Sequence, residues 1–171
     1  LFAPFQGDAR AQLLDTELGG RQVLDAFHAG RRVRIPTRIT HMLAGNIPGL
    51  AVSAILLSLA LKSAVCIKTA SGDPLTAVLL AESIRTVDET LAQCVVVGHW
   101  RGGEQAVERV AFAYADTVVA MGSDAAIADI APRVPGRYIG HGHQVSCALI
   151  GREYLDDDAQ TQQMIEQCAY D

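Results

Sequence analysis

The sequence has few cysteines and little charge, and each shortage excludes a class of protein. Its cysteines are far apart and include no Cys-x-x-Cys pair; they are Cys66, Cys94, Cys147 and Cys168. This spacing fits neither a disulfide framework nor a closed zinc site, and we expect a reducing, cytoplasmic setting. Only 19% of the residues are charged, the net charge is -5, and no long basic run occurs. Binding to nucleic acid is therefore not expected.

The chain also lacks a long apolar run and the common nucleotide-binding motifs. Its most apolar stretch, 50–61, has about a dozen residues, whereas a membrane span needs about 20. We therefore predict a buried helix there and no membrane span. Neither G-x-G-x-x-G nor a Walker A sequence is present. The sequence starts at Leu1 and stops at Asp171 within what reads as an element, so we expect a piece of a longer protein.

Strand and helix patterns alternate along most of the chain, half of which is hydrophobic. Strands are predicted at 40–44, 64–67, 94–97, 117–120, 137–139 and 145–150, and helices at 49–63, 74–92, 104–114, 124–130 and from about 156. This alternation predicts an α/β fold with an open, mostly parallel sheet and helices on both faces. We divide the chain into an N-terminal helical segment at 1–30, an α/β domain at 31–140 and a further region at 141–171.

Polar residues and glycines follow the predicted strands, where open parallel sheets bind ligands. These positions hold Asn46, Lys68, Gly98 and Gly122. Gly122 and Ser123 precede a helix, an arrangement that suits an anion at a helix N-terminus. The carboxylate of Asp124 does not suit an anion and would instead cap that helix. Taken singly, neither Asn46 nor Lys68 requires a ligand. Asparagine is common in turns because it tolerates unusual backbone angles, and a lysine at a strand end can simply be solvated.

Four motifs in matching order resemble one protein family. They are HMLAGNIPG (41–49), IKTASGDPLT (67–76), WRGG (100–103) and ADTVVAMGSDAAIADI (115–130). Together they resemble the LuxC-type long-chain fatty acyl-CoA reductases of the aldehyde dehydrogenase superfamily, over a stretch from about residue 20 to the end. The resemblance implies an aldehyde-dehydrogenase-like variant of the Rossmann fold, with the nucleotide-binding domain at 31–140 and the truncated start of a catalytic region at 141–171.

The resemblance also implies roles for single residues. Asn46 matches an asparagine whose amide donates a hydrogen bond to the oxyanion of a thiohemiacetal. Lys68 matches a lysine that contacts the adenosine ribose or its 2′-phosphate, and Ser71 stands where many NAD-preferring relatives carry a glutamate. Without that carboxylate we expect NADPH as cofactor, with NADH as the alternative. The remaining implied cofactor contacts are Leu43 through its backbone, Gly103 on the adenine side, and Gly122 with Ser123 under the pyrophosphate.

The nucleophile implied by the resemblance lies beyond this chain. In the family it follows the last helix seen here, and we expect all four cysteines to be structural because buried apolar surroundings raise the pKa of a thiol. Gly140 replaces a glutamate that activates water in aldehyde-oxidising relatives, which fits release of aldehyde. His141 and His143 with Cys147 lack a fourth ligand, so no metal site is expected; proton transfer by the histidines is left open.

The implied activity is NADPH-dependent reduction of a fatty acyl-CoA or acyl-protein thioester to an aldehyde through a cysteine acyl-enzyme. We expect this chain alone to be inactive, and the whole enzyme to be a homo-oligomer with acyl-transfer subunits as further partners. One alternative is a CoA-dependent short-chain aldehyde dehydrogenase, which differs in the acyl pocket. The other is a non-catalytic α/β binding module.

Overall fold

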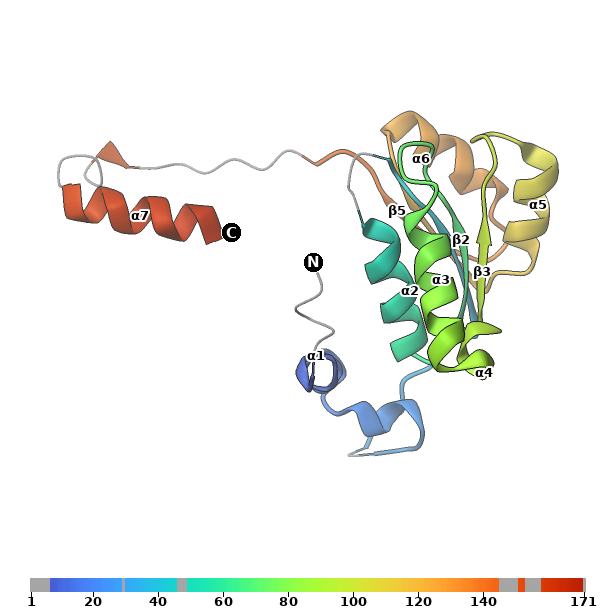
Figure 1. The fold of residues 1–171 in the computed structure, drawn as a ribbon, viewed down its shortest axis with the longest axis horizontal. Coiled ribbons are helices and arrows are strands. Elements are labelled where there is room, and N and C mark those ends of the chain that lie inside the picture. The colour runs from blue at the N-terminus through green and yellow to red at the C-terminus, as the bar shows by residue number, and fades with distance from the viewer. Residues whose placement is uncertain (1–6, 29, 46–48, 145–150, 153–157, 171) are drawn as a thin grey trace.

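The fold is built around an open parallel β-sheet (Figure 1) in a computed structural model that describes residues 7–28, 30–45, 49–144, 151–152 and 158–170. The strands are β1 (Arg38–Met42), β2 (Ala64–Lys68), β3 (Val95–Gly98), β4 (Thr117–Met121) and β5 (Arg137–His141). They pair in the order β3-β2-β1-β4-β5, and every pair is parallel. The predicted α/β fold is therefore confirmed, while the strand predicted at 145–150 lies outside the described residues.

Helices follow the strands in most of the predicted places. They are α1 (Ala9–Leu18), α2 (Leu50–Ala60), α3 (Thr76–Val87), α4 (Glu89–Ala92), α5 (Gln105–Ala113), α6 (Asp124–Ile130) and α7 (Asp158–Tyr170), with 3-10 turns η2 (Arg21–Leu24) and η3 (Ala131–Arg133). The prediction of one helix over 74–92 is wrong, because the backbone is extended at Asp88 (φ −150°, ψ 101°). The Asp88 carboxylate accepts a hydrogen bond from Leu91 N at 2.9 Å and so begins a second helix.

The two faces of the sheet carry separate apolar cores. One core lies under α2 and α3 and contains Leu43, Ala51, Ala54, Ile55, Val65, Ile67 and Ala77. The other lies under α5 and α6 and contains Met42, Phe112, Ala115, Val118, Ala120 and Ile130. Successive residues of a strand point to opposite faces, which is why Met42 and Leu43 belong to different cores. Burying one large apolar side chain contributes about 1.5–3 kcal/mol to the free energy of unfolding. The helices that cover both faces therefore stabilise the sheet by burying its apolar side chains (Figure 1).

The order of the strands changes direction beside β1. From β1 the chain runs outwards through β2 to β3, and it then crosses back to β4 on the other side of β1. In open α/β sheets, ligands bind outside the carboxyl ends of the strands at such a reversal. The ligand site is therefore expected outside the ends of β1 and β4, next to Leu43 and Gly122.

A histidine in β1 is buried beneath α2. His41 is 8% exposed, and its Nε2 lies 3.0 Å from the Oγ of Ser58 in α2. Its buried Nδ1 has no hydrogen-bond partner among the described residues. Burial disfavours the imidazolium ion and lowers the pKa of His41 from 6.5 to about 4. His41 is therefore neutral at pH 7, and its hydrogen bond joins α2 to the sheet.

Acidification is expected to destabilise the fold through His41 by up to about 3 kcal/mol. The unfolded chain takes up this proton near pH 6.5 and the folded chain only near pH 4. The free energy of unfolding therefore falls as the pH decreases between these values, and His41 does not change it above pH 6.5. Urea unfolding of the wild type and His41→Gln from pH 4 to 8 measures this, because glutamine can bond to Ser58 without titrating. A difference between the two proteins that stays constant with pH would contradict the prediction.

Candidate cofactor site

Several of the predicted residues lie at the carboxyl-end edge, the edge of the sheet formed by the last residues of β1 to β5. Lys68 ends β2 and aligns with Met42 of β1 and Gly98 of β3. Leu43 follows β1, and its N–H donates to the Lys68 carbonyl oxygen at 3.2 Å. Gly122 follows β4, whose Ala120 aligns with Met42. Asn46 lies outside the described residues, so its position stays a prediction.

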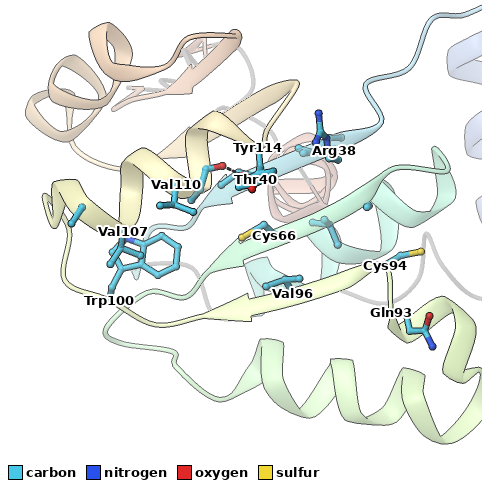
Figure 2. A pocket seen from close by; sticks show the side chains of 15 residues that line it. Arg38, Thr40, Cys66, Gln93, Cys94, Val96, Trp100, Val107, Val110 and Tyr114 are labelled. Carbon is cyan, nitrogen blue, oxygen red and sulfur yellow. Dashed lines mark hydrogen bonds between the residues drawn. The ribbon is translucent and has the colours of Figure 1, made fainter.

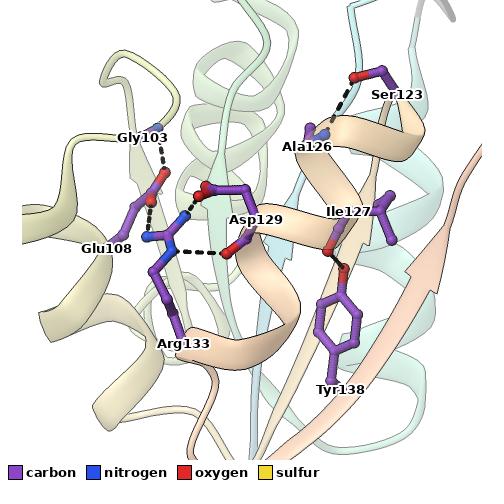
Figure 3. A network of polar contacts seen from close by, with 8 residues as sticks. All are labelled: Gly103, Glu108, Ser123, Ala126, Ile127, Asp129, Arg133 and Tyr138. Atoms are coloured by element: carbon purple, nitrogen blue, oxygen red, sulfur yellow. Dashed lines mark hydrogen bonds and ion pairs between the residues drawn. The ribbon is translucent and has the colours of Figure 1, made fainter.

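The Gly122–Ser123 pair leads directly from β4 into α6. Ser123 is extended (φ −65°, ψ 155°), and its Oγ accepts a hydrogen bond from Ala126 N at 3.3 Å (Figure 3). Ser123 is therefore the helix cap, and the prediction that Asp124 caps the helix is wrong. The Asp124 carboxylate instead accepts from His143 N at 3.0 Å. A pyrophosphate role for the pair stays a prediction that this placement allows.

Ser71 and Gly103 lie in the loops that follow β2 and β3. Ser71 is exposed in the turn before α3. Gly103 is exposed and has φ +85°, a conformation that strains any residue with a side chain, which explains why glycine occupies this turn. Both residues thus lie beyond neighbouring strands on the Lys68 side of the carboxyl-end edge.

The loops after β1 and β2 are packed against each other at this edge. The carboxylate of Asp73 accepts hydrogen bonds from Thr76 N at 3.2 Å and from Gly49 N at 3.4 Å. Hydrogen bonding from the Thr76 side chain, then from its backbone N–H and from Gly49, lowers the pKa of Asp73. A Cβ on Gly72 would lie 3.1 Å from the Gly45 carbonyl oxygen, so a side chain there would push the loops apart. Asp73 and Gly72 therefore fix the backbone on both sides of the segment that contains Asn46.

Lys68 is a largely buried residue whose ammonium has no partner in the described part of the chain but is not sealed from solvent. The residue is 8% exposed, and no hydrogen bond or ion pair joins its Nζ to another described residue. Burial lowers the pKa of Lys68, and the nearby Glu108 carboxylate raises it. Because the stem of Lys68 is buried while its ammonium is unpaired, this side chain is suited to donate charged hydrogen bonds to an anionic group at the carboxyl-end edge.

Sequence reasoning missed a buried ionic cluster between α5 and η3 (Figure 3). The Glu108 carboxylate, 1% exposed, accepts from Gly103 N at 3.0 Å and from Arg133 at 2.5 Å. Arg133 also pairs with Asp129 and lies over the Phe112 ring, 5.8 Å from its centroid. These hydrogen bonds, the one to Glu108 first, raise the pKa of Arg133. One signal was available: Glu108 stands four residues before Phe112, on the apolar face of the helix.

An apolar hollow of about 660 Å³ runs over β2 and β3 beside α5 (Figure 2). Cys66 lies on its floor, Val110 of α5 and Tyr114, which follows α5, lie on one side, and Trp100 lies at one end. Val96 is 59% exposed in this hollow, although parallel sheets are usually covered on both faces. Its lining offers few polar groups, so it does not fit the charged parts of a dinucleotide.

Neither a metal centre nor a membrane helix is found in the part of the chain that the structure describes. Within that part, no three His, Cys, Asp or Glu side chains are grouped so that they could hold a metal ion. His141 ends β5, and Cys147 lies outside the described residues. No described helix is long and apolar enough to cross a membrane.

The fold and its carboxyl-end edge define an open, parallel α/β protein of the Rossmann-like class. The sequence profile of a family described as acyl-CoA reductase (LuxC) matches residues 4–171. The chain therefore belongs to the LuxC family of acyl-CoA reductases.

The chain is also similar to curated proteins of that family. It is 32% identical over 122 residues to the long-chain acyl-protein thioester reductase of Photobacterium phosphoreum, and 33% identical over 129 residues to that of Photorhabdus luminescens. Each alignment covers 67% of this chain and 25% of the relative. The protein of the same name from Aliivibrio fischeri is 37% identical over 90 residues, 51% of this chain and 19% of the relative. The chain thus spans about a quarter of the length of the curated relatives it matches.

Proposed function

We propose that this chain is the nucleotide-binding part of an enzyme that reduces a fatty acyl thioester, carried by CoA or by a protein, to an aldehyde with NADPH. Membership of the acyl-CoA reductase family and the names of the relatives support thioester reduction. The observation that carries the cofactor assignment is Lys68, a residue only 8% exposed that ends β2 at the carboxyl-end edge, one strand from the reversal between β1 and β4.

The residues around Lys68 fit the adenosine half of NADPH. Lys68 supplies a charged donor for the 2′-phosphate, and Ser71, in the loop that follows, supplies a hydroxyl group where a carboxylate would repel phosphate. Gly103 lies in an exposed turn on the same side of the carboxyl-end edge. Because it has no side chain, the adenosine can approach the backbone closely there. When bound, NADPH supplies the hydride that the acyl carbon takes up.

The reaction needs a nucleophile and a donor to the oxyanion. A cysteine thiolate outside this chain attacks the thioester carbonyl, forms a new C–S bond and expels the carrier thiolate. Asn46 donates an amide hydrogen bond to the oxyanion that develops at the acyl oxygen when the acyl carbon takes up hydride. The C–S bond then breaks, which releases the aldehyde and restores the thiolate. The Asp73 and Gly72 contacts hold the backbone at Gly49 and Gly45, on either side of the segment that contains Asn46.

Lys68→Met is expected to weaken NADPH binding to the chain by about 10- to 100-fold, because it removes a charged hydrogen bond to the phosphate. Binding of NADH, which lacks the 2′-phosphate, should weaken by about fivefold or less. Calorimetric or fluorescence titration of the two nucleotides at fixed ionic strength measures both affinities. A variant that weakens both nucleotides equally would place Lys68 away from the 2′-phosphate.

The matched control is Lys62→Met, because Lys62 and Lys68 are the only lysines in the sequence. Lys62 follows α2 and pairs with Asp25 on the exposed surface at the other end of the sheet. Its replacement should leave both affinities unchanged. If the wild-type chain binds neither nucleotide, the cofactor assignment fails and a non-catalytic binding module becomes the better explanation.

A further inference from the structure

Glu108 is an unusual residue for the inside of a protein. Its carboxylate is 1% exposed and lies beside the Phe112 core, on the face of α5 that packs against the sheet. Taking a carboxylate and a guanidinium out of water costs about as much as their attraction returns, and apolar residues of similar volume are often as stabilising. The ion pair with Arg133 is therefore a weak explanation for this residue on grounds of stability alone.

The carboxylate connects two loops that flank the expected cofactor site. One oxygen accepts from the Gly103 N–H at 3.0 Å and holds the left-handed turn between β3 and α5. The other accepts from Arg133 at 2.5 Å, in the turn that directly follows α6 (Figure 3). Because α6 begins at the Gly122–Ser123 pair, one side chain ties together the elements after β3 and β4.

Lys68 points to the face of the sheet that is covered by α5, the helix that carries Glu108. Val65 and Ile67 of β2 belong to the core under α2 and α3. Cys66 lines the hollow on the α5 face, so Lys68, two residues further on, points to that face as well. Burial lowers the pKa of Lys68, and Glu108 is the only charge among the described residues that raises it. On the α5 side the other charged group of the cluster is Arg133, which is already paired with Glu108.

We propose that Glu108 is a positioning residue of the cofactor site, whose carboxylate holds the Gly103 turn and supplies negative charge on the side of the sheet to which Lys68 points, so that both are ready for the adenosine half of NADPH. This inference rests on the proposed function. Glu108 does not touch the cofactor in this arrangement; it acts through Lys68 and Gly103.

The presence of only two lysines gives a direct test in the absence of cofactor. An amine-selective acylating reagent labels the uncharged form of lysine, so the pH dependence of labelling, read by peptide mass spectrometry, follows each lysine separately. In Glu108→Gln the labelling midpoint of Lys68 should shift to lower pH, because its supporting negative charge is gone. The midpoint of Lys62 should not move. Glutamine can still accept the Gly103 hydrogen bond, which keeps the turn intact.

Two further variants separate positioning from structure. Glu104→Gln neutralises an exposed carboxylate at the start of the same helix and should leave the Lys68 midpoint where it is. Glu108→Gln/Arg133→Met removes both charges of the ion pair, so neither member is left buried without the other, and it serves if the single variant unfolds. Its Lys68 midpoint should also shift down. If Glu108→Gln lowers Tm but leaves that midpoint unchanged, Glu108 is structural only and the proposal is overturned.

Nucleotide titrations complete the test and separate this inference from the proposed function. With Glu108→Gln, the preference for NADPH over NADH should fall by about 10- to 100-fold at pH values where its Lys68 has become neutral, while the wild type keeps the preference there. Wild-type binding of NADPH with no change in the variant's pH profile would overturn the role of Glu108 and leave the proposed function standing. Failure of the wild type to bind NADPH would overturn both.

Discussion

Replacing Arg133 with methionine is expected to lower the free energy of unfolding by about 3–5 kcal/mol, the usual cost of leaving a buried charge without its partner. The Glu108 carboxylate is 1% exposed, and Arg133 is the only cation that pairs with it among the described residues. Methionine retains an apolar contact with Phe112 but donates no hydrogen bond. Chemical denaturation of the 171-residue chain at pH 7 measures the loss.

Two companion variants assign that loss to the buried carboxylate. Asp129→Asn neutralises the other carboxylate that pairs with Arg133. The Asp129 side chain is 59% exposed, so its replacement should cost less than about 1 kcal/mol. Glu108→Gln/Arg133→Met replaces the ion pair with two neutral groups and should be more stable than Arg133→Met alone. A double variant less stable than the single one would mean that the unpaired charge is not the cause.

In the full-length enzyme of the proposed function, Asn46→Ala is expected to lower kcat by about 10²- to 10³-fold, the typical effect of deleting one donor to a developing oxyanion. In the proposed mechanism the amide stabilises charge that exists only during the reaction, so binding of NADPH should not change. Steady-state oxidation of NADPH in the presence of acyl-CoA gives kcat, and a separate titration gives the affinity for NADPH.

The aspartate variant sharpens this test. Asn46→Asp keeps the size of the side chain but places a carboxylate where negative charge develops, so it should lose at least as much activity as the alanine variant. An alanine variant with the wild-type kcat would exclude the oxyanion role and leave Asn46 as a turn residue. A fall in NADPH affinity equal to the fall in kcat/KM would instead indicate a disturbed cofactor site.

The elements of the fold were predictable where the local pattern was strong. β2 is a short apolar run without alternation, and the sequence predicts it at nearly its observed bounds because parallel strands are buried on both faces. The helix predicted over 124–130 matches α6, for which Ser123 supplies the cap. The apolar pattern did not reveal the break at Asp88, because it continues across the break while the backbone turns at one side-chain hydrogen bond.

The candidate site likewise contains residues that the sequence could place and contacts that it could not. Lys68, Gly122 and Ser123 could be placed at strand ends from the sequence, since a strand end is a local property. The partners of buried polar groups could not: Ser58 reaches His41 across 17 residues, and Arg133 reaches Glu108 across 25. Such pairs depend on which helix packs on which strand.

The sequence alone determined that apolar strands alternate with helices, that polar residues follow the strands, and which family the motifs resemble. Only the tertiary structure decided the order of the strands, the reversal beside β1, and the burial of Lys68 near Glu108. The physical reason is range. Periodicity and capping act between residues a few positions apart, whereas strand order and the pairing of buried charges are set by contacts between segments that are distant in the chain.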